Sequence, residues 1–297
     1  MPLADPYSGL MGMVKTVGLV LHPQRDSKEA IDTIVEWARA REVTVLGLPD
    51  EVGRIDCSAQ AVDAHALVDR ADLLVSLGGD GTMLRTMRLL TGRSTPVLGV
   101  NLGRLGFLAE IDVDDLPPAL SAIDDHRFTV EPRMAVRASL PGGMAVTAFN
   151  DIALVRIPGD RLAAVSISVE GHPFVRYSSD AVIVATSTGS TAYNFSAGGP
   201  IVSPLVEGFL VVPSAAHSSF SRALVLSADE HVVLELLPSS GELAVEVDGA
   251  VHGHLTAGDR VTVGAVRAAG HVVRLGTTTF YERARRKLRV SGSAEVE

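Results

Sequence analysis

Several features that mark large classes of proteins are scarce or missing in this sequence. There is one cysteine, Cys57, so the chain can form no internal disulfide and no cysteine-based metal site. This usage is typical of a reducing compartment. Aromatic residues make up only 4%, which argues against a stacking platform for single-stranded nucleic acid. The net charge of −9 likewise disfavours nucleic acid or an anionic membrane as partner.

Long apolar runs are also missing. No stretch is long and uninterrupted enough for a transmembrane helix, and the N-terminus lacks the basic region and apolar run of a signal peptide. We therefore expect a soluble, cytoplasmic protein. The two common nucleotide fingerprints, Gly-x-x-x-x-Gly-Lys-Ser/Thr and Gly-x-Gly-x-x-Gly after a strand, do not occur. If the protein binds a nucleotide, it does so through another kind of motif.

The chain has 297 residues, a length typical of two domains, and its sequence pattern changes along its length. Residues 1–127 alternate apolar, strand-like runs with helix-like segments, which predicts a Rossmann-like α/β domain with a parallel sheet. Residues 128–276 hold many short runs rich in Val, Ile and Thr between turn signals, which predicts a β-rich domain of the β-sandwich type. Residues 277–297 become basic and helix-like before a polar tail.

Local patterns predict individual elements in the first domain. Strands are expected at 15–21, 42–48, 72–77 and 96–101, and helices at 27–41, 58–70 and 82–92. Ser27 is expected to be the N-cap of the first helix.

The turn Gly78-Gly79-Asp80-Gly81 ends an apolar strand and opens a helix. Backbone N–H groups at the positive end of a helix form a phosphate cradle, and glycines let a ligand approach the backbone closely. Asp80 does not fit a phosphate cradle, because a carboxylate repels phosphate. It could hold a divalent cation, take a proton from an attacking hydroxyl, or merely cap the helix.

Three further stretches combine strands with polar loops. Residues 99–111, GVNLGRLGFLAEI, follow a strand, and we expect their loop at the same sheet edge as the GGDG turn. Residues 150–157, NDIALVRI, begin with a pair that could bind a ribose or form a turn. Residues 178–202 carry TSTGSTAY and AGGP, which suit a second anion or sugar site, or a polar loop capping a helix.

Two other features are given an ordinary structural role. His252 and His254 alternate on a predicted strand without a third ligand, so no metal site is expected from them. The basic run Arg283, Arg285, Arg286 and Lys287 could touch a phosphate, but it is interpreted as the solvated face of a helix.

In this order, GGDG, NLGRLGFL, the Asn150-Asp151 pair and GSTAY followed by GGP resemble the NAD kinase family. GGDG alone is shared with lipid kinases and phosphofructokinases. The resemblance covers about residues 15–288. It implies an α/β domain carrying GGDG, a β-rich domain that binds NAD, and a C-terminal segment that returns to the first domain.

The resemblance also implies a reaction and its partners. Such enzymes phosphorylate the 2′-hydroxyl of the adenosine ribose of NAD to give NADP. The donor is ATP or, in some bacterial members, inorganic polyphosphate. A divalent cation, Mg²⁺ or Mn²⁺, is required and is expected to be held mainly through donor phosphates. A homodimer or homotetramer is expected.

Residue by residue, the resemblance makes Asp80 the proton acceptor. Donor phosphates and metal are expected at Gly78, Gly79 and Gly81, with Arg85 nearby. The expected NAD-binding positions are Phe107, Asn150, Asp151, Arg161, Asp180, Thr191, Ala192, Tyr193, Asn194, Phe195 and Ser196. Asp151 stands where many members have Glu. The alternatives are a lipid or sphingoid kinase that shares the GGDG domain and a non-catalytic NAD(H)-binding sensor.

Overall fold

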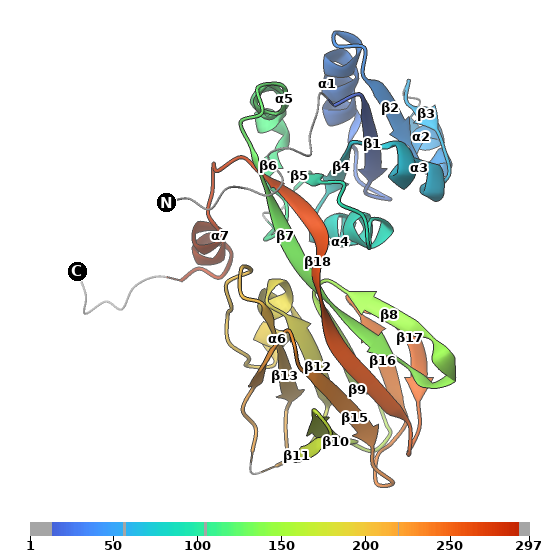
Figure 1. The fold of residues 1–297 in the computed structure, drawn as a ribbon, viewed down its shortest axis with the longest axis vertical. Helices are drawn as coiled ribbons and strands as arrows, with labels where there is room; N and C mark the ends of the chain where they lie inside the picture. The colour runs from blue at the N-terminus through green and yellow to red at the C-terminus, as the bar shows by residue number, and fades with distance from the viewer. Residues whose placement is uncertain (1–13, 56–57, 104–105, 219, 291–297) are drawn as a thin grey trace, which may run out of the picture. The chain divides into compact units, whose positions relative to one another are not determined.

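The computed structural model describes residues 14–55, 58–103, 106–218 and 220–290, so Cys57 and the Arg104-Leu105 pair lie outside it. The chain divides into two compact units (Figure 1). Unit 1 comprises the described parts of 1–132 and 270–297, and unit 2 comprises the described parts of 133–269. Among the described residues, no helix combines the length and apolarity needed to cross a bilayer.

Unit 1 is an α/β unit around a parallel sheet in the order β3-β2-β1-β4-β5. Its strands are β1 Thr16–Leu21, β2 Thr44–Gly47, β3 Gln60–Ala61, β4 Leu73–Gly78, β5 Val97–Asn101 and β6 Ile111–Asp112. Its helices are α1 Lys28–Arg39, α2 Pro49–Ile55, α3 Ala64–Arg70, α4 Asp80–Leu89, α5 Leu116–Asp124 and α7 Phe280–Lys287, with a 3-10 turn at Val113–Asp115.

Side chains that alternate along the strands cover both faces of this sheet. Leu19 and Val75 point to the face packed by α1 and α5, where Ile34 and Leu120 complete the core. On the other face, a Cβ at Gly18 would lie against side chains of α3 and β4. Burial on both faces explains why the strands read as nearly continuous apolar runs.

The GGDG turn and the end of β5 share one edge of the sheet. Gly78 is paired with Asn101 in the β4–β5 register, and the N–H of Leu102 donates to the carbonyl of Gly78. The expected location of the 99–111 loop beside the GGDG turn is confirmed. Helix α4 starts at Asp80, with Gly79 as its N-cap, so Asp80 is the first helical residue and not a cap.

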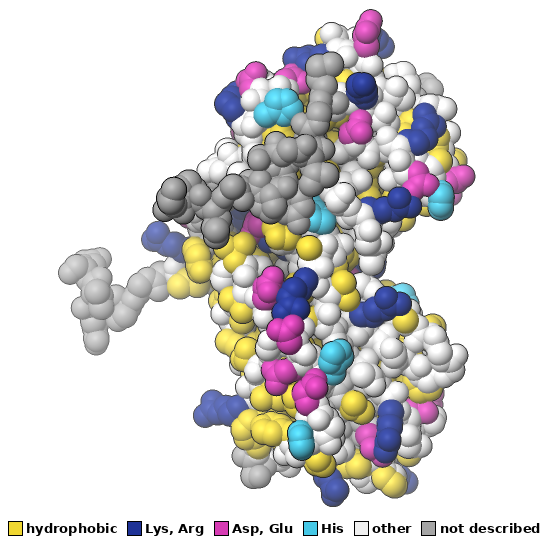
Figure 2. Space-filling view, viewed as in Figure 1, with side chains coloured by type: hydrophobic (Ala, Val, Ile, Leu, Met, Phe, Trp, Pro, Cys, Tyr) yellow, Lys and Arg dark blue, Asp and Glu magenta, His cyan; other side chains and the backbone are white. Residues whose placement is uncertain are grey.

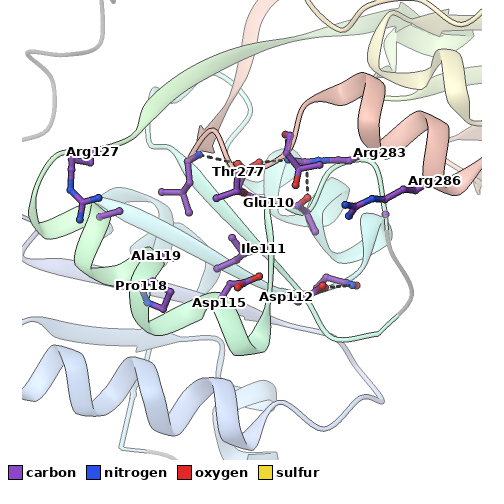
Figure 3. A pocket seen from close by; sticks show the side chains of 16 residues that line it. Glu110, Ile111, Asp112, Asp115, Pro118, Ala119, Arg127, Thr277, Arg283 and Arg286 are labelled. Carbon is purple, nitrogen blue, oxygen red and sulfur yellow. Dashed lines mark hydrogen bonds and ion pairs between the residues drawn. The ribbon is translucent and has the colours of Figure 1, made fainter.

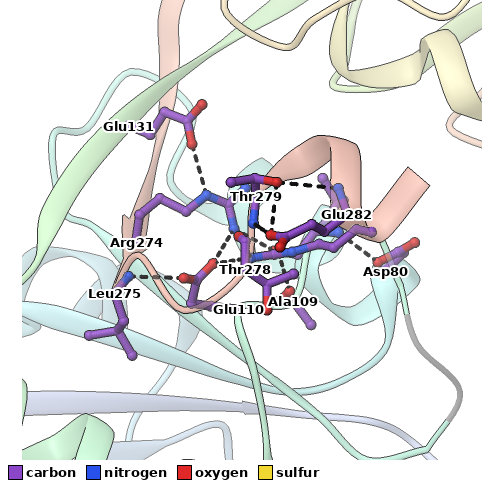
Figure 4. A network of polar contacts seen from close by, with 11 residues as sticks. Asp80, Ala109, Glu110, Glu131, Arg274, Leu275, Thr278, Thr279 and Glu282 are labelled. Atoms are coloured by element: carbon purple, nitrogen blue, oxygen red, sulfur yellow. Dashed lines mark hydrogen bonds and ion pairs between the residues drawn. The ribbon is translucent and has the colours of Figure 1, made fainter. Parts of the chain in front are cut away.

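A buried carboxylate ties the C-terminal segment of unit 1 to the segment after β5 (Figure 4). Glu110 is fully buried, and its Oε2 accepts from Arg274 at 2.7 Å and from Arg283 at 2.5 Å. Its Oε1 accepts the N–H of Leu275 at 2.9 Å. Glu131 binds the same Arg274 at 2.8 Å. Helix α7 is therefore fixed to unit 1 by charged hydrogen bonds that bridge more than 160 residues of sequence.

Unit 2 is built from antiparallel strands. One sheet has the order β14-β13-β12-β9-β16-β17, and another group has the order β11-β10-β15-β18, with β7 paired to β8. Apolar residues from both groups, such as Val165 and Val184, form one core. This is a sandwich-type arrangement, as the sequence predicts.

The bounds of its strands are β7 Thr129–Ser139, β8 Ala145–Ala148, β9 Asp151–Arg156, β10 Ala163–Val169, β11 His172–Ser179, β12 Ala181–Thr186, β13 Gly208–Ser214, β14 Leu224–Ser227, β15 His231–Leu236, β16 Leu243–Val247, β17 Ala250–Leu255 and β18 Arg260–Arg274. The ends of β7 and β18 belong to unit 1. Helix α6 spans Tyr193–Ser196, and 3-10 turns lie at Pro141–Gly143 and Thr188–Thr191. Acidic and basic side chains are interspersed on the face shown in Figure 2.

Several local expectations were wrong. The helix predicted over 58–70 begins only at Ala64, because β3 takes up its first residues, and α2 and α5 were not predicted. Ser27 occupies the N-cap position of α1, yet its side chain makes no capping bond. Its backbone, at φ −131° and ψ 12°, departs from the extended conformation that aims a capping hydroxyl at the first turn.

The interpretation of residues 283–287 as a solvated helix face was also wrong for two of them. Arg283 is only 3% exposed, because it is the partner of Glu110. Lys287 contacts the carboxylate of Asp80. A local charge pattern cannot reveal such partners, since they lie more than 170 residues away in sequence.

Glu110→Gln is expected to lower the free energy of unfolding by about 3 kcal/mol, because it leaves the buried guanidinium of Arg283 without its counter-charge and removes one of the two carboxylates that pair with Arg274. Urea unfolding measures the change. The control is Glu207→Gln, at a carboxylate that pairs with Arg267 but is 66% exposed; its cost should stay below about 1 kcal/mol. Equal costs for the two variants would contradict the structural role of Glu110.

Candidate functional site

A cavity of about 980 Å³ in unit 1 opens at the start of α4. The cations that line it are Arg25, Arg85, Arg88, Lys287 and Arg289. His22, Gly79, Gly81, Thr82 and Gly106 also line it. Asp80 is the one carboxylate among the described lining residues. Such an excess of positive charge at a helix N-terminus suits a ligand with several phosphate groups.

The carboxylate of Asp80 is held by three donors. The N–H of Phe107 donates to Oδ2 and the N–H of Leu108 donates to Oδ1, both at 3.0 Å. The ammonium of Lys287 donates to Oδ2 at 3.2 Å. A carboxylate has about four lone-pair positions, so one position on Oδ1 is left for a further donor. A hydroxyl could occupy it.

Two glycines make this arrangement possible. A Cβ on Gly106 would lie 2.1 Å from Oδ1 of Asp80, so a larger residue would displace the carboxylate or the loop. A Cβ on Gly78 would lie 2.1 Å from Oγ1 of Thr82. At Gly81, a Cβ would meet no atom within 4 Å, which is consistent with open space in front of the backbone.

Arg85, one of the cations that line the cavity, is held in place by its neighbours. Nη2 of Arg85 donates to Oε1 of Glu51 and to the carbonyl of Leu21, both at 2.6 Å. In the lining of the same cavity, Nδ1 of His22 accepts the N–H of Gln24 at 3.1 Å and that of Arg25 at 3.0 Å. Burial, followed by the charges of Arg25, Arg54 and Arg85, lowers the pKa of His22.

A second cavity of unit 1, of about 350 Å³, shares Gly106 with the first (Figure 3). Its lining includes Glu110 and Arg283. Asp112, Arg127 and residues from α5 and from 275–286 also line it. None of the residues predicted from the sequence to bind ligand is found among its described lining residues. It nevertheless adjoins the site at Asp80, because Gly106, which lines both cavities, lies against the Asp80 carboxylate.

In unit 2, a second group of predicted residues converges around Asp151. This residue begins β9 and is only 4% exposed. Burial, together with the nearby Asp248 and Glu246 carboxylates, raises the pKa of Asp151 to about 7, against a lowering by the N–H of Tyr193. Asp151 therefore carries a proton for part of the time at neutral pH.

Asp248 holds the backbone that leads into β9. Its carboxylate accepts the N–H of Asn150 at 2.7 Å and those of Phe149 and Asp151 at 3.3 Å. Asp248 and Gly249 both have positive φ, of 47° and 80°, which the tight hairpin between β16 and β17 requires. The hairpin thereby fixes the Asn150-Asp151 pair.

Tyr193 links the two polar stretches of unit 2. Its N–H hydrogen-bonds Asp151 and its hydroxyl hydrogen-bonds Ser214. Its ring packs on an apolar face of the six-stranded sheet that includes Ala153, Ile183 and Leu210. Burial, followed by the Glu246 charge, raises the pKa of Tyr193.

The remaining predicted residues lie in different surroundings. Asp180 pairs with Arg156 at 2.6 Å just before β12, and Arg161 is exposed in the turn between β9 and β10. Asn194 is fully buried, and its amide donates to the carbonyls of Ser190 at 2.7 Å and Pro200 at 3.0 Å. Thr191 and Ala192 are half-buried, whereas Phe195 and Ser196 are exposed.

Comparisons with known proteins match both units. The ATP-NAD kinase N-terminal domain matches residues 17–128, and the ATP-NAD kinase C-terminal domain matches residues 149–275. The chain belongs to the NAD kinase family. NAD kinase 1 of Streptomyces avermitilis is 37% identical, with 94% of this chain and 88% of that protein covered. The NAD kinase of Moorella thermoacetica is 34% identical, with 95% and 92% covered.

Solved structures of NAD kinases share the fold. The yeast NADH kinase complexed with NADH has a TM-score of 0.85 at 28% identity, with 96% of this chain and 90% of that chain covered. An NAD kinase from Archaeoglobus fulgidus in complex with ATP has a TM-score of 0.72 at 27% identity, with 93% and 100% covered. The family and the fold class expected from the sequence are confirmed.

Within this NAD kinase fold, sequence reasoning missed several residues. Arg25, Arg88, Lys287 and Arg289 line the cavity at Asp80 but belong to no motif. Glu246 and Asp248 act on Asp151 from another strand and hairpin. Only the basic run 283–287 gave a signal in the sequence, and it was assigned to solvent.

Gly106→Ala is expected to lower the free energy of unfolding by about 3 kcal/mol, because the added Cβ separates Asp80 from the two N–H groups that hold it. Urea unfolding tests this. Gly53→Ala, in α2 where a Cβ meets no atom within 4 Å, is the control and should be neutral or stabilising by up to about 1 kcal/mol. A neutral Gly106→Ala would show that Asp80 is not held this way.

The raised pKa of Asp151 predicts how stability depends on pH. Its folded-state pKa of about 7 exceeds the ordinary value of 3.8, so the folded protein binds the extra proton between these pH values. The free energy of unfolding should fall as pH rises from 4 to 7, by at most about 4 kcal/mol from this group. Asp151→Asn should remove this loss and raise stability at pH 8, as measured by urea unfolding across the pH range.

The control for this prediction is Asp160→Asn. Hydrogen bonds from the N–H groups of Arg161 and then Glu242 lower the pKa of that exposed carboxyl, so its own contribution changes below pH 4. This variant should keep the wild-type loss of stability between pH 4 and 7. The same loss in Asp151→Asn would assign it to another group.

Proposed function

We propose that the protein is an NAD kinase that transfers the terminal phosphoryl group of ATP or inorganic polyphosphate to the 2′-hydroxyl of the adenosine ribose of NAD, forming NADP. The observation that carries this proposal is the single carboxylate of Asp80 at the start of α4 in a cavity lined by cations. The ATP and NADH complexes of the two similar structures support these two ligand classes.

Asp80 is assigned as the general base. The 2′-hydroxyl donates to the open position on Oδ1, and its oxygen attacks the terminal phosphorus of the donor. The hydroxyl proton passes to Asp80, the new P–O bond forms, and the bond to the bridging oxygen breaks so that ADP or a shortened polyphosphate leaves. The N–H groups of Phe107 and Leu108 fix the carboxylate in place, which is the positioning that phosphoryl transfer needs.

The donor phosphates are assigned to the backbone at Gly78, Gly79 and Gly81 and to the cations of the cavity, including Arg85. The described residues contain no group of three or more His, Cys, Asp or Glu side chains that could hold a metal. Mg²⁺ or Mn²⁺ is proposed to be held mainly by the donor phosphates, a mode that Mg²⁺ favours. When bound, such a cation neutralises phosphate charge.

The NAD contacts are assigned mainly to unit 2. Asn150 and Asp151 are proposed to hold the adenosine ribose, and Asp180 the nicotinamide carboxamide. Tyr193 and the exposed or half-buried parts of 191–196 are proposed to lie along the dinucleotide, with Arg161 contributing a positive charge. Phe107 of unit 1 is proposed to lie near the adenine. Residues 1–127 with 277–297 thus serve the donor, and residues 128–276 bind NAD.

We also propose that the protein acts in the cytoplasm as a homodimer or homotetramer.

The two alternatives considered from the sequence are disfavoured. A lipid or sphingoid kinase gives no reason for the second family domain, which matches residues 149–275. A silent NAD(H) sensor gives no reason for a carboxylate held at the mouth of a phosphate-binding cavity.

Purified protein with NAD, ATP and Mg²⁺ is expected to produce NADP. Asp80→Asn should lower kcat by about a thousandfold, because the amide cannot accept the hydroxyl proton, while NAD still binds within about threefold of wild type. Asp32→Asn, on the exposed surface of α1, is the matched control and should keep full activity. A crossed assay of NAD and NADH with ATP and polyphosphate identifies the preferred pair.

Two outcomes would contradict the proposal. Wild-type protein that forms no NADP with either ATP or polyphosphate is not an NAD kinase. Equal phosphorylation of diacylglycerol under the same conditions would favour a lipid kinase.

A further inference from the structure

Lys287, in the last turn of α7, makes two contacts at the mouth of the phosphate-binding cavity. Its ammonium lies 3.2 Å from Oδ2 of Asp80 and 4.5 Å from the centroid of the Phe107 ring. Its side chain is 37% exposed, so it can move into the cavity that it lines. The ammonium therefore lies between the proposed base and the proposed place of the donor.

The position of Lys287 is set by the buried end of its own helix. Arg283 precedes it by four residues and so lies on the same face of α7. Arg283 binds Glu110 and the carbonyl of Ala109, both at 2.5 Å. The start of α7 is closed by a capping box between Thr279 and Glu282. The helix is thus fixed, whereas the end of the Lys287 side chain is free to change partner.

Two anions compete for this one cation. In the structure its partner is Asp80, which has a single negative charge. A triphosphate in the cavity would place several negative charges beside the same ammonium, and charged hydrogen bonds to phosphate are among the strong ones. The Phe107 ring attracts the ammonium in its present position, since cation–π attraction acts over about 6 Å.

We propose that Lys287 is a catalytic residue that changes partner: it binds Asp80 when the donor site is empty and the terminal phosphoryl group once a triphosphate or polyphosphate donor is bound. This inference rests on the proposed function. The transfer of the ammonium frees a second lone-pair position, on Oδ2, and removes a positive charge from the carboxylate, so Asp80 becomes a better acceptor for the hydroxyl proton when a donor is present. At the same time, the ammonium neutralises charge on the phosphoryl group that is transferred.

This change of partner predicts that Lys287 contributes to the binding of a nucleotide with a third phosphate more than to the binding of one without it. Lys287→Met should weaken ATP binding by about tenfold or more, and ADP binding by less than about threefold, because ADP lacks the terminal group. Titration calorimetry with Mg²⁺ and each nucleotide measures the ratio. Lys287→Arg keeps the positive charge and should restore most of the preference for ATP. Arg285→Met removes one charge from the same helix outside the cavity and should leave the ratio unchanged.

A double-mutant cycle tests the competition itself. Asp80→Asn releases Lys287 and should strengthen ATP binding by about fivefold. In the Lys287→Met background, the gain in ATP affinity from the same substitution should be at least threefold smaller, because there is no Lys287 ammonium to release. Since the side chain of Lys287 is partly exposed, Lys287→Met should keep the wild-type thermal unfolding temperature, which separates its effect from misfolding. Tripolyphosphate and pyrophosphate provide the same comparison for a polyphosphate donor.

The outcomes separate this inference from the proposed function. If wild type forms NADP but Lys287→Met weakens ATP and ADP equally, or no more than Arg285→Met does, the exchange is wrong and the kinase assignment stands. Additive effects in the cycle would likewise overturn the exchange. If wild type forms no NADP with ATP or polyphosphate, the proposed function fails whatever the cycle shows.

Discussion

The site in unit 1 depends on the fully buried carboxylate of Glu110, which binds the buried Arg283 and the partly buried Arg274. Because a charge without its partner is very unfavourable in the interior, Arg274 and Arg283 cannot leave Glu110 at little cost. This constraint fixes α7 against the segment that follows β5. That segment supplies the two N–H groups that hold Asp80, and α7 supplies Lys287. One buried charge cluster therefore positions both the proposed base and its cation.

The carboxylates of Asp80 in unit 1 and Asp151 in unit 2 have neighbours of opposite charge. Asp80 has three hydrogen-bond donors and lies in a cavity lined by cations. Asp151 is buried beside two other carboxylates, and its pKa is raised to about 7. A protonated Asp151 can donate as well as accept, which suits a ribose hydroxyl pair. The difference follows from the neighbours, since both residues begin an element after a polar turn.

Sequence reasoning succeeded where the signal is local and periodic. Strands β1, β2, β4 and β5 and the helix after GGDG were expected within a few residues of their observed bounds, because burial on both faces gives such strands an apolar sequence. It failed where the backbone depends on distant contacts. The segment 58–63 looks helical by composition, yet part of it pairs with β2 as a strand. Ser27 had a good N-cap residue type but an unsuitable backbone conformation.

The sequence by itself determined the family, the α/β and β-rich parts, and the motif residues Asp80, Asn150, Asp151 and Tyr193, because these depend on composition, periodicity and motif order along the chain. Only the tertiary structure decided which charges meet. That Lys287 contacts Asp80, that Arg283 is buried against Glu110, and that Asp248 holds the start of β9 are pairings across about 100 to 200 residues. Such pairings arise when folded elements bring distant side chains within hydrogen-bond distance, and no local pattern encodes them.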